Sequence, residues 1–428
     1  MANEVICQVP DQPTQNLLPE GLLPAGWQRI RLGDHVTRIG SGLTPLGGES
    51  SYLSAGIPLI RSQNVLMNQF SPIGLSFISP EQDQVMCSSR VEKRDVLLNI
   101  TGASIGRVCV VPDAYCPANV NQHVCVIRCT ENLNPRYLAL YLSTPGFQRR
   151  LMQSQAGATR QALTKRMIAD FIVPLPPSGE QERIAALVEG QLGVIKRARA
   201  ATQAQMDSVQ ALPAMYYRAA FGEEHAELSS GWRLVRLQDA SRFLPARSIA
   251  AEGDTEIEAA TSACLTETGF DPSGTKKARM FCADAVICRC ESGEVLVARS
   301  NTPELVGRAS EYLGVPMNIV SSDLTIRIRA NPELNSSYLA AYLSALFLRG
   351  YWRRNSGGAS GSMKKITRRQ VAELLIPLPT IIEQKRQVSE LNDYLRGYTR
   401  LRCRIETQLS ELDALPAALL RRAFSGEL

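Results

Sequence analysis

The chain has 428 residues, of which 44% are apolar and 21% charged, and a formal net charge of +6, as in a globular protein of two or more domains. No apolar run reaches the ~18–20 residues of a membrane-spanning helix, and the N-terminal segment lacks the basic and apolar regions of a secretory signal. We therefore expect a cytoplasmic protein with no membrane partner, whose eleven cysteines are reduced. The mild positive charge is compatible with a nucleic-acid partner but does not establish one.

One unit of about 203 residues occurs twice along the chain. Gly26-Trp27 recurs as Gly231-Trp232, Tyr137–Ser143 as Tyr338–Ser344, Pro174–Pro176 as Pro377–Pro379, Glu180-Gln181 as Glu383-Gln384, and Leu212–Ala214 as Leu415–Ala417. The interiors, 40–130 and 245–330, share little beyond strand and turn texture. The expected domains are a tail at 1–20, modules at 21–176 and 226–379, and helical spacers at 177–225 and 380–428. Similar frames with different interiors favour two different binding surfaces.

The first module begins with strand-like runs at 57–60, 95–98, 108–111 and 124–127, followed by an amphipathic helix at 135–143. The fold class expected for each module is α+β, with an irregular, mostly antiparallel sheet. Its polar loops contain residue types that read base edges, since Arg suits guanine and Asn or Gln suits adenine. The candidates for DNA binding are Arg61, Gln63, Asn64, Thr101, Ser104, Arg107, Asn121, Gln122 and His123. Ordinary turn chemistry is the alternative explanation for these residues.

A basic tract follows, because Arg136 to Ala169 contains six basic residues, no acidic residue and a glycine-bearing turn at 156–159. Such a tract suits a phosphate backbone, with Arg160 and Lys165 as candidate contacts, although a solvated basic face is the alternative.

A long helix is predicted over 180–212, started by a capping box at Ser178 and Gln181 and stopped by Pro213. Its seam has coiled-coil spacing at Ala185, Val188, Leu192, Ile195, Arg199, Thr202, Met206 and Val209.

The second module repeats this order, with strand-like runs at 285–288, 294–297 and 324–328 and a helix at 332–348. The DNA-binding candidates of its loops are Arg299, Ser300, Asn301, Thr302, Arg308 and Asn318. Its basic tract, Arg349 to Arg369, has seven basic residues and no acidic one, and adds Lys364 and Lys365.

The second long helix is predicted over 383–415, capped by Thr380 and Glu383 and stopped by Pro416. Its seam lies 203 residues after the first, at Val388, Leu391, Leu395, Tyr398, Arg402, Ile405, Leu409 and Leu412. Matched register favours pairing of the two helices into a rod roughly 50 Å long. The alternative is that each helix packs only on its own module.

Signatures of catalysis and of metal binding are absent from the sequence. There is no phosphate-binding loop, no dinucleotide fingerprint and no Asn/Asp-Pro-Pro-aromatic tetrapeptide of amino-methyltransferases. The three histidines (His35, His123, His225) lack partners at metal-ligand spacing. Cys125, Cys288 and Cys290 lie in or beside apolar runs, and we expect them, like Cys129 and Cys282, to be buried thiols that behave as small hydrophobes rather than metal ligands. We expect no catalytic residue, metal or cofactor in this chain.

Over about 24–428 the sequence resembles the specificity subunits of type I restriction–modification systems. The resemblance is carried by the two Gly-Trp starts, Gly40–Pro45 with Thr44, Ile57–Arg61, Arg299–Arg308, Pro174–Ile184 and the helix ends Arg218–Phe221 and Arg421–Phe424. It implies two target-recognition domains, each reading one half of an asymmetric bipartite double-stranded DNA site, with Thr44 as a further DNA-binding candidate.

The resemblance also implies that the two antiparallel helices space the domains in a pseudo-twofold cyclic arrangement and dock two methyltransferase subunits. Those partners hold S-adenosylmethionine and the adenine chemistry, and restriction–translocase subunits using ATP and Mg may join them. Two alternatives remain: a coiled-coil scaffold that binds no DNA, and a recognition subunit of another class of restriction system.

Overall fold

The computed structural model describes residues 23–155, 162–222, 231–357 and 363–428. These residues pack as two units. Unit 1 contains the described residues up to Ala201 together with Leu409–Leu428, and unit 2 contains those from Thr202 to Gln408. Both long helices therefore contribute residues to each unit. None of the helices in this part of the chain is both long and apolar enough to cross a membrane.

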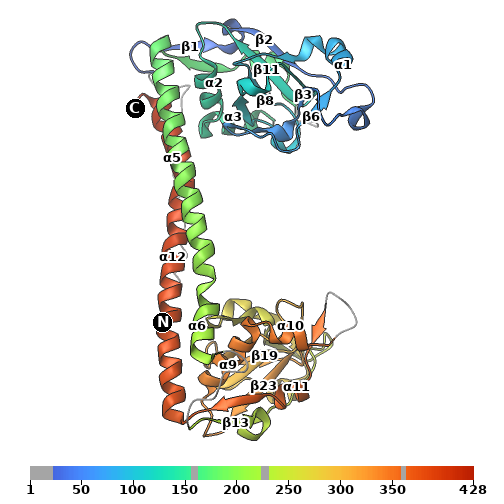
Figure 1. Cartoon of the computed structure of the whole chain (residues 1–428), viewed down its shortest axis with the longest axis vertical. Coiled ribbons are helices and arrows are strands. Elements are labelled where there is room, and N and C mark those ends of the chain that lie inside the picture. Colours follow the sequence, from blue (N-terminus) through green and yellow to red (C-terminus); the bar gives the residue numbers. More distant parts are fainter. Residues whose placement is uncertain (1–22, 156–161, 223–230, 358–362) are drawn as a thin grey trace. The chain divides into compact units, whose positions relative to one another are not determined.

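Unit 1 is built on two four-stranded sheets (Figure 1). The first is antiparallel, in the order β2 (Val36–Ser41), β11 (Val124–Cys129), β8 (Val96–Asn99), β9 (Val108–Val110). The second has the order β6 (Ser76–Ile78), β3 (Ile57–Ile60), β10 (Ala118–Val120), β7 (Arg90–Val91), with β3 and β10 parallel. Two short pairs complete the strands: β1 (Gln28–Arg31) with β12 (Ile172–Leu175), and β4 (Val65–Leu66) with β5 (Gln69–Phe70).

Helices pack on the first sheet of unit 1: α2 (Pro135–Leu142), α3 (Pro145–Gln155), α4 (Lys165–Ala169), the start of α5 (Ser178–Gln210) and the end of α12 (Ile381–Ser425). The short helix α1 (Pro80–Val85) lies against the second sheet, where its Asp83 forms an ion pair with Arg90 of β7. The α2 helix is buried almost all round, and its Tyr137 hydroxyl donates to the Pro174 carbonyl at 2.8 Å. The main core joins the sheet, α2, Ile184, Val188 and Phe424. Both long helices thus belong to this core.

Unit 2 repeats the same element order. Its antiparallel sheet is β14 (Ser241–Phe243), β23 (Thr325–Ala330), β19 (Glu294–Ala298), β21 (Ala309–Tyr312), and its second sheet is β18 (Lys276–Met280), β15 (Thr255–Ala260), β22 (Ile319–Ser321). The short pairs are β13 (Arg233–Arg236) with β25 (Leu375–Leu378), β16 (Leu265–Thr266) with β17 (Gly269–Phe270), and β20 (Ser300–Asn301) with β24 (Lys364–Lys365). Its helices are α6 (Leu212–Phe221), α7 (Leu237–Ala240), α8 (Cys282–Cys288), α9 (Ser336–Leu348), α10 (Tyr351–Asn355) and α11 (Arg368–Ala372).

The strand and turn texture shared by the two module interiors corresponds to a shared strand order. The two interiors differ in their side chains but have nearly the same strand order, and in each the second sheet contains one parallel pair, β3 with β10 or β15 with β22. The α+β class with a mostly antiparallel sheet is confirmed.

The strand expected at 285–288 is wrong, because this run lies in helix α8. Ala285 N–H donates to the Phe281 carbonyl at 2.9 Å. Ala285 and Cys288 are buried while Val286 is 63% exposed, which is the one-sided burial of a helix. A four-residue apolar run does not distinguish a strand from a helix.

The long helices are confirmed, with two corrections at their ends. Pro416 does not stop α12, which continues to Ser425, whereas Pro213 opens α6 after α5 ends at Gln210. A proline in a helix interior removes one donor but need not end the helix when the flanking turns are packed, as Leu419 and Leu420 are.

The expected capping boxes also differ from the structure. Ser178 is the first residue of α5 rather than its cap, and the Gln181 side chain binds elsewhere. Thr380 does cap α12, because its hydroxyl accepts from Glu383 N at 3.3 Å.

Within unit 1 the two long helices run antiparallel. Arg183 Nη2 donates to the Leu428 carbonyl at 2.7 Å, and Arg199 Nε pairs with Asp413 Oδ1 at 2.5 Å. Every expected seam position is buried or half-buried except the two arginines, Arg199 and Arg402. Pairing and packing on the module coexist, because Val188 lies in the core of unit 1 and Val388 packs against that of unit 2.

Candidate nucleic-acid interface

In unit 1 the polar loops that the sequence singles out meet at one edge of the sheets. They follow the C-terminal ends of β2, β3, β8 and β10, because the parallel strands β3 and β10 end together and β8 ends where its neighbour β11 begins. Asn121 N donates to the Ile60 carbonyl at 3.1 Å, and Ile100 N donates to the His123 carbonyl at 3.0 Å. We call the residues of these loops, Gly42–Thr44, Arg61–Asn64, Ile100–Arg107 and Asn121–His123, the loop edge of unit 1.

Some side chains of this loop edge hold the loops together by hydrogen bonds to their backbone. Asn64 is fully buried, and its amide holds the backbone of Arg61, Ser71 and Ile73. Arg61 Nη2 and Gln63 Nε2 both donate to the Gly74 carbonyl, at 2.8 and 2.9 Å. For Asn64 the turn-chemistry explanation is therefore favoured, because its hydrogen-bonding groups are already used.

Other side chains of the loop edge are available to a ligand. Thr101 Oγ1 lies 2.6 Å from His123 Nδ1, and Gln122 Nε2 lies 3.0 Å from His123 Nε2. Gln122 is exposed while the Asn121 side chain turns inward and accepts from His123 N at 3.1 Å. The short chain of polar groups therefore fixes the imidazole and presents the Gln122 amide to solvent.

A backbone hydrogen bond joins the basic tract of unit 1 to the same edge. Leu163 N donates to the Ile100 carbonyl at 2.9 Å, so the exposed Lys165 at the start of α4 lies close by. Thr44 and Arg107 are exposed and Ser104 half-buried in the same loops. Arg160 lies outside the described residues.

Other members of the tract have structural partners. Arg136 forms an ion pair with Glu189 of α5, and Arg166 lies 3.9 Å from Asp170. These pairs reduce the number of cations that the tract offers to phosphates.

Unit 2 has a corresponding loop edge, which we define as Arg247, Ser262, Arg299–Thr302, Asp323 and Lys364–Lys365. Strand β20 pairs with β24, so that Ser300 lies opposite Lys365 and Asn301 opposite Lys364. The basic tract is thus placed directly beside the loop, across more than sixty residues of sequence. Arg299 and Lys365 are exposed, whereas Lys364 and Thr302 are half-buried.

Three predicted residues of unit 2 have local structural roles. The Asn301 amide donates to Ser262 Oγ at 2.5 Å and its oxygen accepts from Thr302 N at 2.8 Å. The Arg308 guanidinium lies over the Phe347 ring, 5.4 Å from its centroid. Asn318 has φ +66°, a left-handed conformation that asparagine tolerates, and it precedes β22, at the end of that strand away from Arg299. The structure therefore does not bring Asn318 to the loop edge.

Sequence reasoning missed Arg247 and Asp323. The Arg247 carbonyl accepts from Asp323 N at 2.9 Å, and Arg299 Nη1 donates to the Asp323 carbonyl at 3.2 Å. Both residues lie in sequence segments without a repeated motif. Only the structure, which brings these distant segments together, shows that they belong to the loop edge.

The two loop edges are held by the same backbone hydrogen bonds. In unit 1 these are Leu163 N to Ile100 O and Gly106 N to Asn99 O, and in unit 2 Ile366 N to Arg299 O and Gly307 N to Ala298 O, at 2.8–2.9 Å. Gly106 and Gly307 both have positive φ, and a Cβ on Gly307 would lie 2.0 Å from Trp352 Cδ1. One backbone frame therefore presents two different sets of side chains.

The cysteines lie outside the two loop edges. Cys125, Cys288 and Cys290 are buried as expected and Cys129 is half-buried, but the expectation of burial is wrong for Cys282, which is exposed at the start of α8. Burial raises the pKa of Cys125 and of Cys290 to about 12, so both stay protonated at neutral pH. Among the described residues no cluster of His, Cys, Asp or Glu has the size of a metal site.

Known proteins resemble this chain in sequence and in fold. Residues 24–189 match the family described as the type I restriction modification DNA specificity domain. The chain is 20% identical to the StySPI specificity subunit of Salmonella potsdam over 95% of its own length and 90% of that protein. It is 30% identical to the EcoBI specificity subunit of Escherichia coli over 39% of its length and 35% of that protein.

Over residues 24–189 the chain matches the specificity-domain family, and over 95% of its length it is similar to type I restriction–modification specificity subunits. Solved structures agree on the specificity-subunit fold. An HsdS subunit from Thermoanaerobacter tengcongensis superposes with a TM-score of 0.64 at 21% identity, covering 96% of this chain and 99% of that one. A chain from a structure of a type I restriction–modification system gives a TM-score of 0.75 at 21% identity, covering 95% of this chain and 100% of that one.

Proposed function

We propose that this protein is the DNA sequence-specificity subunit of a type I restriction–modification complex. The observation that carries the proposal is the pair of loop edges, in which one backbone frame presents different polar side chains in unit 1 and unit 2. Different side chains on equivalent frames suit the reading of two different half-sites of an asymmetric double-stranded DNA site.

The exposed side chains divide into two roles by their chemistry. Gln122 and Arg107 of unit 1, and Arg299 of unit 2, have amide or guanidinium groups that suit base edges. Lys165 and Lys365 are exposed point charges beside them, which suit phosphates and hold the protein in register on the duplex. Asn64 supports the loops from within and is not proposed to touch DNA.

The chemistry of modification and restriction belongs, in this proposal, to partner subunits. Two methyltransferase subunits supply S-adenosylmethionine-dependent adenine methylation, and restriction–translocase subunits supply ATP- and Mg-dependent cleavage. The family resemblance supports this division, as does the absence from the sequence of a phosphate-binding loop or an amino-methyltransferase tetrapeptide.

The long helices are proposed to set the distance between the half-sites. Their matched seams and their antiparallel ion pair at Arg199 and Asp413 support this role. Inserting one heptad into each helix, between residues 201 and 202 and between 408 and 409, adds about 10 Å, or about 3 base pairs. The modified site should keep both half-sites with a longer spacer, and loss of all recognition would contradict a spacing role.

DNA binding separates this proposal from a coiled-coil scaffold. The assembled complex should bind duplex DNA with an affinity that falls steeply with salt, because phosphate contacts release counterions. The isolated chain should methylate no DNA. A gel-shift series across salt showing weak, salt-independent binding would favour the scaffold.

A further inference from the structure

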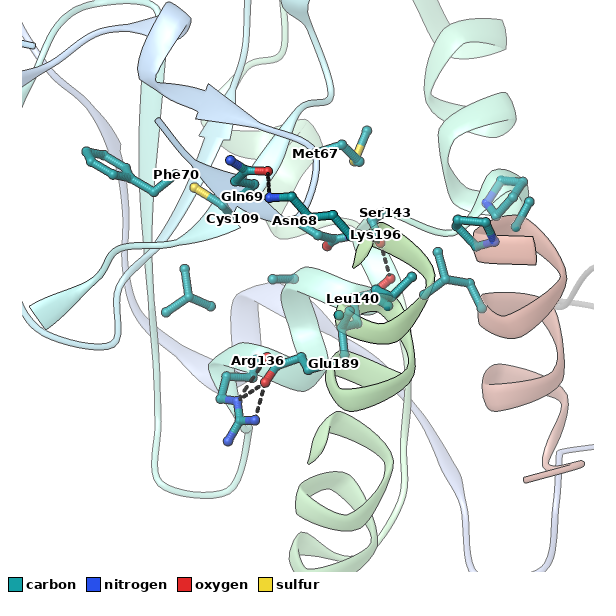
Figure 2. Close-up of a pocket in the computed structure, with 18 of the residues that line it drawn as sticks. Met67, Asn68, Gln69, Phe70, Cys109, Arg136, Leu140, Ser143, Glu189 and Lys196 are labelled. Atoms are coloured by element: carbon teal, nitrogen blue, oxygen red, sulfur yellow. Dashed lines mark hydrogen bonds and ion pairs between the residues drawn. The ribbon is translucent and has the colours of Figure 1, made fainter. Parts of the chain in front are cut away.

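A cavity of about 800 Å³ opens in unit 1 between the β4–β5 hairpin and helices α2, α5 and α12 (Figure 2). Apolar side chains such as Leu140, Leu192 and Leu420 line it. Polar groups stand around it, namely the Arg136–Glu189 ion pair and Lys196, which donates to Gln69 Oε1 at 2.9 Å (Figure 2). None of these groups belongs to the loop edge of unit 1, so the cavity is separate from the proposed DNA contacts.

The corresponding place in unit 2 contains a tyrosine. The repeat that aligns Phe221 with Phe424 also aligns Tyr217 with Leu420. Tyr217 is 5% exposed and packs against Leu391 and Leu395. Its hydroxyl donates to the carbonyl of Glu267, in the turn of the β16–β17 hairpin, at 2.8 Å.

Unit 1 has the equivalent hairpin turn but a leucine, Leu420, in the place of this tyrosine. The counterpart of Glu267 is Met67, which lies in the β4–β5 turn and lines the cavity. Leu420 is shorter than tyrosine and has no donor. Asn68 lines the same cavity, and its side-chain oxygen is buried without a hydrogen-bond partner among the described residues, while its amide nitrogen donates to Ser143 Oγ at 2.8 Å. A buried acceptor without a donor costs free energy that a bound hydroxyl would recover.

We propose that this cavity receives an aromatic side chain, tyrosine by preference, from a partner protein. The preference comes from unit 2, where the chain itself places a phenol against the equivalent hairpin. A polypeptide fits better than a free phenol, because 800 Å³ exceeds one ring and leaves room for flanking backbone. Apolar floors with charged rims are also typical of the pockets that bind aromatic anchors at protein interfaces. The proposal rests on the proposed function only in taking a subunit of the same complex as the partner.

The first test uses a probe and a variant that closes the cavity. N-acetyl-L-tyrosinamide should bind the full chain, measured by saturation-transfer NMR and titration, and Leu420→Tyr should weaken it at least about tenfold. Leu420→Met, which changes volume little, is the matched control and should bind as the parent does. Tyr217→Leu should create a second probe site in unit 2, so the test does not depend on one variant folding. Equal probe binding by the parent and Leu420→Tyr would overturn the proposal.

The second test identifies the source of the side chain. Titration of the full chain with the methyltransferase subunits of the same system should show assembly weakened about tenfold or more by Leu420→Tyr but not by Leu420→Met. If Leu420→Tyr abolished probe binding and left assembly unchanged, the occupant would be a free small molecule and the partner assignment would fail. Failure of the proposed function would look different, because the Leu420→Met complex would assemble and yet modify no bipartite DNA site.

Discussion

The side-chain oxygen of Gln384 accepts a 2.7 Å hydrogen bond from the backbone N–H of Asn335, and its amide nitrogen donates to the carbonyls of Glu333 and Pro379. Gln181 makes the same three bonds in unit 1, to Asn134, Asn132 and Pro176. One buried glutamine therefore fastens the start of each long helix to the turn that precedes α2 or α9. The repeated glutamine thus has a structural cause.

Replacing either glutamine by alanine should destabilise its unit. Gln181→Ala and Gln384→Ala each remove three hydrogen bonds and leave buried backbone groups without partners, at a cost of about 2–4 kcal/mol in the free energy of unfolding. Urea denaturation measures this cost. Gln191→Ala and Gln408→Ala, exposed on the same helices, should stay within about 0.5 kcal/mol of the parent. Equal effects of the buried and exposed pairs would contradict the assignment.

Gly42 should not tolerate a side chain, because a Cβ there would lie 1.6 Å from the Val120 carbonyl oxygen. Gly42→Ala is expected to cost about 3 kcal/mol or more and to displace the loop that carries Thr44. Gly40→Ala is the control, since its nearest atom is Arg38 Nε at 4.0 Å. Thermal unfolding of the two variants should separate them clearly, and similar melting temperatures would refute the close approach.

Lys165 is expected to contact phosphate. In the assembled complex Lys165→Gln should weaken binding to all DNA sequences alike and reduce the slope of log K against log salt by about 0.9. Lys93→Gln removes an equal charge near the start of β8, at the opposite end of that strand from the loop edge, and should leave the slope unchanged. A change of half-site sequence in Lys165→Gln would mean that this side chain reads bases instead.

Thiol reactivity should follow burial. Burial raises the pKa of Cys109, Cys125 and Cys290 to about 12, so at pH 8 these groups are protonated, and only the thiolate reacts. Iodoacetamide at pH 8 should therefore label the exposed Cys87, Cys282 and Cys403 long before those three. Peptide mass spectrometry gives the order of labelling, and fast labelling of Cys125 in the folded protein would contradict its burial.

Periodic patterns were the parts of the fold that the sequence predicted best. The two helix seams are predictable, apart from Arg199 and Arg402, because one buried face repeats over many turns. The strand at 294–297 is predictable because an apolar run lies in a sheet buried on both faces. The run at 285–288 was misassigned because four apolar residues fit either a strand or one turn of helix. The helix end expected at Pro416 is wrong because packing around the helix outweighs the loss of one donor.

The candidate site was predicted as a set of loops but not as a set of contacts. Sequence alone does not distinguish Gln122, which faces solvent, from Asn64, which is buried and satisfied, since both are amides in polar loops. It also does not place Lys365 opposite Ser300, because that pairing joins strands far apart in the chain. Burial and strand pairing decide which of the predicted residues a duplex could reach.

The most direct test of the account is an exchange of the second module. Residues 226–376 would be replaced by the equivalent segment of a known type I specificity subunit, and methylated adenines would be mapped in DNA from cells that carry the complete system. We predict that one half-site changes to that of the donor while the other half-site is retained. A site altered in both halves, or in neither, would contradict the claim that each unit reads its own half.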